Sequence, residues 1–568
     1  MPSTRTLLSA LLPVLSLVAL QPHPRLCASG FITPSPTLST SCTAPTHPVG
    51  PKSRMVVHSH ATRPRQPKCI RTTPQRLSRV PLSTSRLDAG AFSFSSNAFR
   101  QHVLGSSCRV ADSLRHQGRT KMAAGGLTGA DAKVVERRVG RASGSRSVNW
   151  PLWYVLPIAP YQKRKTLMEE VVPGKVWTFD QLQGILYVIV PVRMTVIKLE
   201  NTPGGGLFVY APVAPTGECL SMIRALEAEH GPVKHIVLGT LGLEHKVFAG
   251  PFAQRFSEAD VWYHPGQYSF PIGLPLSWLG FGGRPTRQIP AESKEAPWAA
   301  DLDHAVLGPF FSKDGSGGYG ETAFFHKASQ TLLVTDMVVK VEDEVPEIVA
   351  QDPRPLLFHA RDNAYERVEN TRDVLRKGWR RIVQFALTFQ PSSLEVVDLK
   401  TALFKDAPQS KMKELGWGGL FPFIWKSSTQ DVKSFQAMKG GLLVAPILQV
   451  LLLNRDPIPV LDWADRVSKW PFKRIIPCHL ANNIAATPQD FRKAFRFLEK
   501  GGSSRNPSST ASFGDGWMSL FGGGGGGGAG GAQPLAEDLQ FLRDAEKTLV
   551  ELGTLFPAKE PVDRSARQ

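Results

Sequence analysis

The chain has 568 residues, a formal net charge of +19 and a pI near 9.7, and its length suits three or four average domains. The charge is uneven, because residues 1–130 hold 16 Lys and Arg against two acids, a surplus of +14, and the remainder carries only +5. Binding of nucleic acid requires a basic face on the part that folds. We therefore expect no nucleic-acid partner.

The first 130 residues have the composition of a targeting sequence. Residues 1–30 contain the apolar run Leu7–Leu20 followed by small residues, which is typical of a signal peptide, and the run is too short to span a membrane. Residues 31–130 are rich in Ser, Thr, Arg and Pro and lack Glu, as in a disordered transit peptide. The pair resembles the bipartite plastid presequence of algae with secondary plastids and implies a plastid (chloroplast) location. A disordered basic tail or a mispredicted start codon is the alternative.

The mature chain begins with alternating strands and helices. The apolar spacing and the turn residues predict these elements, in chain order: strand Arg193–Glu200, turn Asn201–Gly206, helix Glu218–His230, strand His235–Leu238, helix Gly250–Phe256, strand Ala259–Tyr263 and strand Thr331–Val339. A strand, helix, strand order indicates an α/β layer. No Gly-Lys-Ser/Thr follows the glycines of the turn, so a hairpin is favoured over a phosphate loop.

The second half of the chain is more helical. Arg474–His479 is predicted as a strand that ends at a His, and Thr487–Lys500 as a helix capped by Thr487. The apolar run Gly441–Asn454 is interrupted by a Pro and is predicted as buried core, with no transmembrane span in the mature chain. The composition divides the mature chain as follows: core 150–350, helical and aromatic insertion 351–440, core 441–500, Gly/Ser-rich linker 501–533 and C-terminal helix 534–557, which docks on the body or, less ordinarily, on a partner.

One segment carries the candidate chemistry. A strand enters Thr240, and a short loop ends at Glu244 and His245. This resembles the metallo-β-lactamase fold family, in which Thr-His-x-His-x-Asp-His stands at such a strand end. Leu241 and Leu243 occupy the positions of two His, and Glu244 that of the Asp. The resemblance extends to Leu332–Asp336, similar to the strand ending in a metal-bridging Asp, and to Ile475–His479, similar to the strand before the last His ligand, but Gly315–Glu321 offers no third His.

More narrowly, residues 150–500 resemble a plastid and cyanobacterial domain family of uncharacterised function that carries an insertion before the last His. The resemblance implies a four-layer αββα metallo-β-lactamase-like sandwich. It also implies that the first site of the family's metal pair has lost its donors, since Leu offers none. Glu244, His245, Asp336 and His479 keep the donors of the second site for one Zn, Fe or Mn ion.

A structural interpretation of the same residues remains open. A His at a strand end is often structural, an Asp there often caps a loop, and two Leu add core burial. Asp301-Leu-Asp303-His304 is better explained as a solvated acidic loop. Cys478 and His479 are adjacent on a strand and point to opposite faces, so they form no nucleophile pair. With only Cys219 and Cys478 in the mature part, no disulfide framework is indicated.

Two functions therefore follow. The slightly favoured one is a catalytically silent scaffold that binds a protein or small-molecule partner, such as a pigment or lipid. Its binding surface would be the filled pocket or the aromatic residues of the insertion, Trp417, Phe421, Phe423 and Trp425. The alternative is a mononuclear metal-dependent hydrolase or oxidoreductase that uses the four retained donors.

Overall fold

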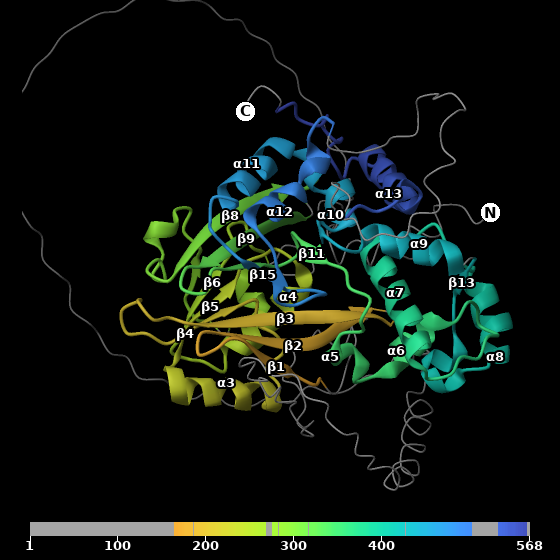
Figure 1. Ribbon diagram of the computed structural model, residues 1–568, viewed down its shortest axis with the longest axis horizontal. Helices are drawn as coiled ribbons and strands as arrows, with labels where there is room; N and C mark the ends of the chain where they lie inside the picture. Colours follow the sequence, from red (N-terminus) through yellow and green to blue (C-terminus); the bar gives the residue numbers. More distant parts are fainter. Residues whose placement is uncertain are drawn as a thin grey trace, which may run out of the picture. The chain divides into compact units, whose positions relative to one another are not determined.

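The computed structural model (Figure 1) describes residues 164–564 except 186, 269–274, 282, 316, 427 and 502–531. The expected signal peptide (1–30) and transit peptide (31–130) lie outside the described residues, as does nearly all of the expected linker 501–533. The expected domain bounds stay predictions. None of the described helices combines the length and the apolarity needed to cross a membrane.

The first sheet joins an antiparallel half to a parallel half. Its seven strands lie in the order β1 (Leu167–Val172), β2 (Val176–Ile185), β3 (Val188–Lys198), β4 (Leu207–Tyr210), β5 (Val233–Leu238), β6 (Asp260–Tyr263) and β7 (Thr286–Gln288). The pairs from β1 to β4 are antiparallel and those from β4 to β7 parallel. Helices α3 (Gly217–His230) and α4 (Leu243–Ala253) supply the crossovers that parallel neighbours need.

The second sheet brings together strands that are far apart in the sequence. Its order is β16 (Ile484–Ala485), β15 (Arg474–Pro477), β10 (Thr331–Val334), β9 (Gly318–His326) and β8 (Leu302–Phe311). Only the pair β10 and β15 is parallel. Two small pairs complete the strands: β11 (Val339–Lys340) with β14 (Leu442–Leu443), and β12 (Leu394–Val396) with β13 (Phe423–Trp425).

One expected strand is wrong in its extent. Thr331–Val339 is not a single strand, because β10 ends at Val334 and β11 begins at Val339. The amide N–H groups of the intervening turn are bound by the Glu321 carboxylate rather than by a neighbouring strand. The apolar residues on both sides of the turn obscured it in the sequence.

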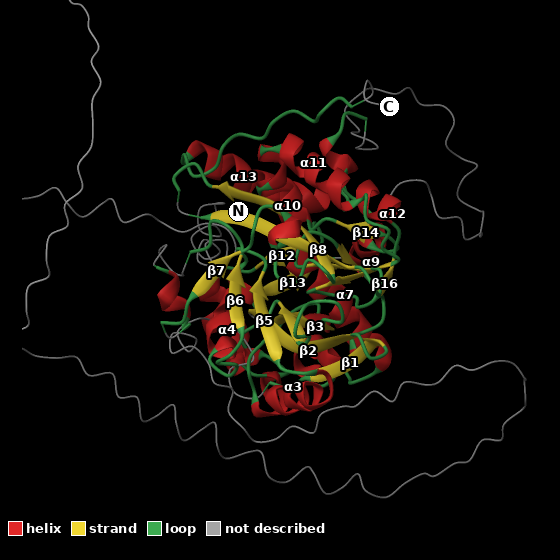
Figure 2. Ribbon diagram, turned by 90° about the vertical axis from the view of Figure 1, so that its left-hand side faces the viewer, coloured by secondary structure: helices red, strands yellow, loops and turns green. Residues whose placement is uncertain are grey.

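The two sheets face each other with helices outside both (Figure 2). Ile223 of α3 and Phe252 of α4 belong to one buried cluster with strands of the first sheet. Phe208 and Phe324 belong to the cluster between the sheets. A third cluster joins Leu332 to helices that include α11 (Pro457–Val467) and α12 (Pro488–Lys493). Each large apolar side chain buried in this way contributes about 1.5–3 kcal/mol. The result is the expected four-layer αββα sandwich.

The insertion lies against the hairpin formed by β2 and β3. The helices after β11 are α5 (Glu347–Ala350), α6 (Pro353–Ala360), α7 (Arg372–Thr388), α8 (Ala407–Gln409), α9 (Ser428–Met438) and α10 (Pro446–Leu451). The longest, α7, contacts β3. Its buried Arg381 forms ion pairs with Asp362 (2.6 Å) and Asp431 (2.7 Å). These pairs tie α7 to α9 and to the loop after α6.

Three of the four aromatic residues expected to form a recognition surface are core residues. Phe421, Phe423 and Trp425 are buried in one cluster, and of the four only Trp417 is exposed, at 43%. The expectation that all four form a recognition surface is therefore wrong. They pack against each other and against α6 and α7, because the insertion needs an apolar core of its own.

The last two helices attach to the body of the domain. Thr487 caps α12, and its side chain and that of Asp490 form a capping box, as the sequence predicts, but the helix ends at Lys493 rather than Lys500. The C-terminal helix α13 (Gln540–Glu551) buries Leu542, Ala545 and Leu549 and contacts α10. Docking on the body is thus confirmed.

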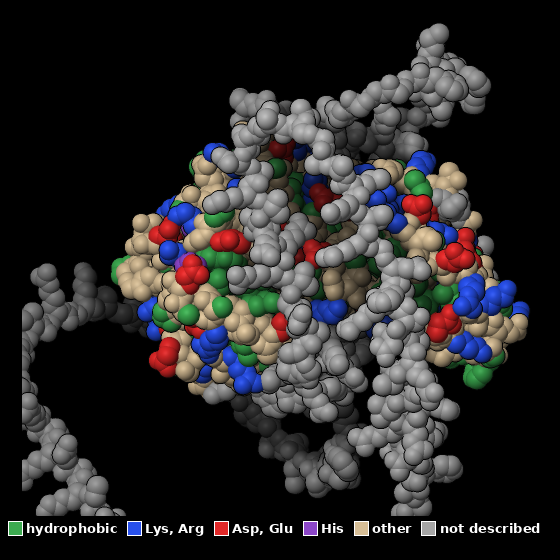
Figure 3. Space-filling model, turned by 60° about the horizontal axis from the view of Figure 1, so that its bottom comes forward, with side chains coloured by type: hydrophobic (Ala, Val, Ile, Leu, Met, Phe, Trp, Pro, Cys, Tyr) green, Lys and Arg blue, Asp and Glu red, His purple; other side chains and the backbone are tan. Residues whose placement is uncertain are grey.

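Acidic and basic side chains alternate on the face drawn in Figure 3, where the described residues are coloured. Acidic and basic residues elsewhere in the described part of the chain form pairs at the surface, such as Arg376 with Glu344 (2.6 Å) and Lys559 with Asp456 (2.7 Å). Pairs of this kind contribute little to stability, about 0–1 kcal/mol each. The mixed charge agrees with the nearly neutral balance of the sequence after residue 130.

Candidate metal centre

Glu244 and His245 lie in the first turn of α4, directly after β5. The loop between β5 and α4 is fixed, because Thr240 forms a β-bridge with Glu321 of the second sheet and its hydroxyl accepts a hydrogen bond from the amide of Gly242 (3.1 Å). The expected loop ending at Glu244 and His245, with a helix from Gly250, is therefore wrong. The helix begins at Leu243, with Gly242 as an N-cap that has no side chain to signal the start.

Asp336 and His479 follow two strands that pair in parallel. Val334 of β10 is opposite Pro477 of β15, and each functional residue comes two positions after its strand residue. The carboxyl ends of parallel neighbours meet at one edge of a sheet. The register alone therefore brings Asp336 and His479 together, although 142 positions separate them in the sequence.

Glu321 of β9 holds the turn that carries Asp336. Its buried carboxylate accepts hydrogen bonds from the amides of Thr335 (2.9 Å), Asp336 (3.0 Å) and Met337 (3.0 Å), and from the hydroxyl of Tyr319 (3.0 Å). Burial and the charge of Asp336 raise the pKa of Glu321, while the amide donors oppose the rise. The carboxylate acts as an anchor for the turn.

Arg193 of β3 holds the turn that carries His479. Its guanidinium is buried and donates to the carbonyls of Pro477 (2.7 Å) and Leu480 (3.2 Å), on either side of the histidine. Asp180 pairs with the same guanidinium through two bonds of 2.7 and 2.8 Å. Such a bidentate arrangement fixes the orientation of both partners.

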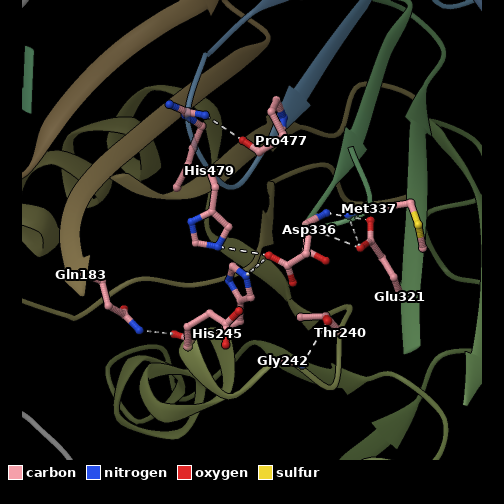
Figure 4. A network of polar contacts seen from close by, with 12 residues as sticks. Gln183, Thr240, Gly242, His245, Glu321, Asp336, Met337, Pro477 and His479 are labelled. Atoms are coloured by element: carbon pink, nitrogen blue, oxygen red, sulfur yellow. Dashed lines mark hydrogen bonds and ion pairs between the residues drawn. The ribbon is translucent and has the colours of Figure 1, made fainter. Parts of the chain in front are cut away.

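The side chains of His245, Asp336 and His479 point toward one another (Figure 4), and Glu244 completes the cluster. The Nε2 atoms of His245 and His479 lie 3.4 and 3.1 Å from the Oδ1 atom of Asp336. One donor atom from each of these residues and from Glu244 fits within a mutual distance of 4.8 Å. Donors that share a tetrahedral Zn²⁺ ion at about 2.0–2.2 Å lie about 3.3–3.6 Å apart. A small inward movement would meet that geometry.

The nitrogen atoms of the two histidines differ in their partners. His479 Nδ1 lies 2.8 Å from the carbonyl of Pro191 and must donate, so its Nε2 is the nitrogen that faces Asp336 and would be the one available to a metal ion. His245 is buried, and its Nδ1 has no hydrogen-bond partner among the described residues. A buried polar atom without a partner costs about 1–3 kcal/mol. This cost is more often tolerated at a functional site than in an ordinary core.

The charges of the cluster reinforce one another. Burial would raise the pKa of Asp336, but the charges of His245 and His479 and their hydrogen bonds hold it well below its usual range. Burial would lower the pKa of His245, but Asp336 and, less strongly, Glu244 and Glu321 raise it. An ionised carboxylate therefore faces two imidazoles, and together with Glu244 this set of N and O donors suits a divalent cation.

The neighbouring positions offer no second set of donors. Leu241 and Leu243 stand where the resembled motif has histidines, and both are buried, with 3% and 6% of their surface exposed. Between them, Gly242 approaches the cluster closely, since a Cβ there would lie 3.3 Å from Asp336 Oδ2 and from His245 Cδ2. The described residues contain one group of three or more convergent donors, and it is this one.

Asp301 is a structural residue, and the expectation of a solvated acidic loop there is wrong. It is buried, and its carboxylate accepts hydrogen bonds from the amide (2.8 Å) and the hydroxyl (2.7 Å) of Thr202 and from the amide of Asn201. Burial would raise the pKa of Asp301, but these bonds lower it. His304 of the same stretch makes a contact of 2.8 Å through Nε2 with the carbonyl of Pro290.

A cavity of about 280 Å³ adjoins the donor cluster. Glu244, Asp336 and His479 line its inner end, and the side chains around them are mostly apolar. Its walls come from the end of the hairpin formed by β2 and β3, from α7 and from α10. The insertion, through α7 and Phe389, thus forms one side of the chamber that leads to the four donors, and α10 from the following part of the core forms another.

The sequence predicted the four donors but missed the residues that position them. Glu321 lies where the resemblance called for a third histidine, and a carboxylate in that loop was the available signal. Arg193 stands in a predicted strand, and nothing in its local pattern indicated that it binds a turn 284 residues away. Gln183 also escaped notice, although its side-chain amide donates to the carbonyl of Glu244 (3.3 Å).

The family described as a domain of unknown function, DUF4336, matches residues 173–497. The chain belongs to the DUF4336 family. This match spans the four donors, both anchors and the insertion that lines the cavity. The family's description assigns no activity to them, and the comparison with curated proteins found no match.

Solved structures similar to this DUF4336 chain are metallo-β-lactamase-fold proteins of low identity. A metallo-beta-lactamase from Pontibacter korlensis is 11% identical, with 58% of this chain and 99% of that chain covered and a TM-score of 0.28. The DIM-1 metallo-beta-lactamase is 8% identical, with 59% and 98% covered and a TM-score of 0.27. A flavoprotein from Thermotoga maritima is 10% identical, with 59% and 61% covered and a TM-score of 0.30. At these values the similarity carries nothing about activity.

Proposed function

We propose that this protein is a mononuclear metal-dependent hydrolase. Glu244, His245, Asp336 and His479 hold the ion, which is Zn, Fe or Mn. The observation that carries the proposal is the convergence of these four donors, from three separate stretches of chain, within 4.8 Å of one another. The chemistry supplied by such an ion is Lewis-acid activation of a carbonyl group and of water at neutral pH.

The residues around the donors have separable tasks. Glu321 and Arg193 fix the turns that present Asp336 and His479, as the outer partners of metal ligands commonly do. The carbonyl of Pro191 fixes the tautomer of His479. The walls of the cavity beside the donors are mostly apolar and offer a substrate an apolar surface to pack against.

Hydrolysis is favoured over oxidoreduction because it needs only water as a co-reactant. An oxidoreductase would also require an electron donor or acceptor. The silent scaffold remains the second candidate, and the observation that favours it is the burial of Leu241 and Leu243 at two positions of the resembled metal motif. Metal content separates the two candidates.

The test is elemental analysis of the purified full chain after incubation with Zn²⁺, Fe²⁺ or Mn²⁺ and removal of free ions. We expect about one ion per chain for one of the three metals. His479→Ala and Asp336→Ala should retain less than a tenth of it, whereas Glu229→Gln, whose side chain is 74% exposed on α3, should retain all of it. Absence of a stoichiometric ion from the folded wild-type chain would leave only the scaffold.

We also propose that residues 1–130 direct the protein to a plastid. Their excess of basic residues and lack of Glu support import across two membranes in series. A fluorescent fusion to residues 1–130 should accumulate in plastids. A fusion that stays in the cytosol would refute this location without affecting the metal site.

A further inference from the structure

The cavity beside the four donors has a chemical character that selects its ligand. Its walls include Val188 and Val190 at the end of β3, Phe385 and Leu387 of α7, and Ile447 and Leu448 of α10. Apolar walls favour an apolar ligand because its surface leaves water on binding, by roughly 25 cal/mol for each Å². The wall residues come from three elements, so the chamber belongs to the assembled fold rather than to one helix.

The cavity has acidic side chains in its lining and no Lys or Arg among the described residues that line it. Glu244 and Asp336 are the acidic residues, and His479 beside them is charged only when protonated. In the metal-free chain, a ligand carboxylate or phosphate would enter this space without a Lys or Arg to pair with it, and burying an unpaired anion is costly. The lining of the metal-free chain therefore selects against anions and for uncharged molecules.

The polar residues that line the cavity are neighbours of one another. Glu244, Asp336 and His479 belong to the donor cluster, Gln183 donates to the carbonyl of Glu244, and the hydroxyl of Tyr319 donates to Glu321, which holds the turn of Asp336. A ligand that matches this distribution has one polar group and an apolar chain. The volume of about 280 Å³ equals about nine times the roughly 30 Å³ that a water occupies in the liquid, which suits a chain of medium length.

We infer that the cavity binds an uncharged carboxylic ester with an apolar acyl chain, its ester group facing the four donors. This inference rests on the proposed hydrolase. Hydrolysis of such an ester joins a water oxygen to the acyl carbon, breaks the acyl C–O bond and transfers a proton to the departing alcohol oxygen. The reaction is balanced with water alone.

Binding is measured on the metal-free full chain with N-phenyl-1-naphthylamine, a neutral probe that fluoresces in apolar surroundings. Methyl octanoate and octanoate compete for the probe, and they share the acyl chain but differ in charge. We expect the wild-type chain to bind the probe and the ester to displace it at a concentration at least tenfold lower than the acid. A folded chain that ignores the probe, or equal displacement by the acid, would overturn the inference.

Two variants place the probe in this cavity. Leu448→Lys puts a cation in the wall, so it should weaken probe binding and reduce the advantage of the ester over the acid. Ile458→Ser changes a residue that is 53% exposed on α11 and should leave both unchanged. If Leu448→Lys unfolds the chain, Leu387→Trp serves instead, because a larger side chain should exclude the probe. Unaltered binding by either folded wall variant would put the probe elsewhere and refute the assignment.

The outcome is independent of the metal measurement. If the ester displaces the probe but elemental analysis finds that the chain takes up no ion, the ligand class stands and the hydrolase is refuted. A stoichiometric ion without probe binding would keep the metal site and remove the ester. The two proposals can therefore fail separately.

Discussion

The anchoring of Asp336 by Glu321 can be tested by the substitution Glu321→Gln. The carboxylate accepts four hydrogen bonds, three of them from consecutive backbone amides. In Gln, an NH₂ group replaces one of the carboxylate oxygens, so one hydrogen bond is lost and two donors face each other. The remaining hydrogen bonds are weaker because their acceptor is no longer charged. Bonds to charged groups contribute about 1.5–3 kcal/mol and neutral bonds about 0.5–1.5 kcal/mol, so the gross loss is about 4–6 kcal/mol.

Removal of a buried charge offsets part of this loss. Burial and Asp336 raise the pKa of Glu321, which shows that its ionised form is disfavoured by desolvation and by its neighbour. We therefore expect Glu321→Gln to lower the free energy of unfolding by about 2–4 kcal/mol. The turn after β10 should also loosen. The amount of metal that stays bound to the chain through dialysis should therefore fall at least tenfold.

The assay combines urea unfolding with metal analysis of the folded fraction. Tyr319→Phe is the matched control, since it removes one of the four bonds and leaves the three backbone bonds that fix the turn. It should cost about 1–2 kcal/mol and leave metal content unchanged. The reasoning fails if Glu321→Gln unfolds within 1 kcal/mol of the wild type and still holds a full complement of metal.

Three further predictions concern the site, the core and the cavity. Gly242→Ala should change the free energy of unfolding by no more than about 1 kcal/mol, since its φ of −54° suits any residue. It should weaken metal binding at least tenfold, because the added Cβ lies 3.3 Å from Asp336 Oδ2. Thermal unfolding measures the first effect and elemental analysis the second. Burial lowers the pKa of His235 to about 4, below the unfolded value of about 6.5, so its contribution to stability is present above pH 6.5 and is lost as the pH falls toward 4. His235→Gln should reduce this loss by about 2 kcal/mol in urea titrations at pH 4.5 to 7, and parallel curves would contradict it. Phe389, at a φ of 61° on the cavity wall, should be replaceable by Gly at a cost of no more than about 2 kcal/mol, because relief of the backbone strain offsets part of the lost packing, and the larger cavity should favour methyl decanoate over methyl octanoate as a competitor of the probe.

Several strands of the core could be predicted because their apolar residues are local signals, whereas β1, β2, β8 and β9 were not predicted. The strands around Arg193–Glu200, His235–Leu238 and Ala259–Tyr263 were found within a few residues of their ends. The strand at Thr331–Val339 was not, because its end is set by a carboxylate from another strand. The residues that neighbour Asp336 in the sequence do not indicate that the carboxylate of Glu321 binds the amides of this turn.

The start of α4 shows a second limit. Helices that begin with Ser, Thr, Asp or Asn announce their first turn, as Thr487 does for α12. Gly242 carries no such side chain, and Gly250 within the helix further weakens the helical pattern. Gly250 is needed for close packing, since a Cβ there would lie 1.9 Å from the carbonyl oxygen of Leu279. Gly250, which packing against a distant segment requires, is therefore one of the residues that weaken the helical pattern in the sequence.

The four donors were predictable from resemblance, but the chamber beside them was not. The donors depend on the ends of β5, β10 and β15, whose order in the chain is enough to place them at one edge. The cavity depends on how α7 and α10 lie against the end of the hairpin formed by β2 and β3, and no motif encodes that angle. The insertion therefore has a physical role that its sequence alone does not reveal: it gives the retained donors an apolar, uncharged approach, and the choice of ligand follows from that approach more than from the donors themselves.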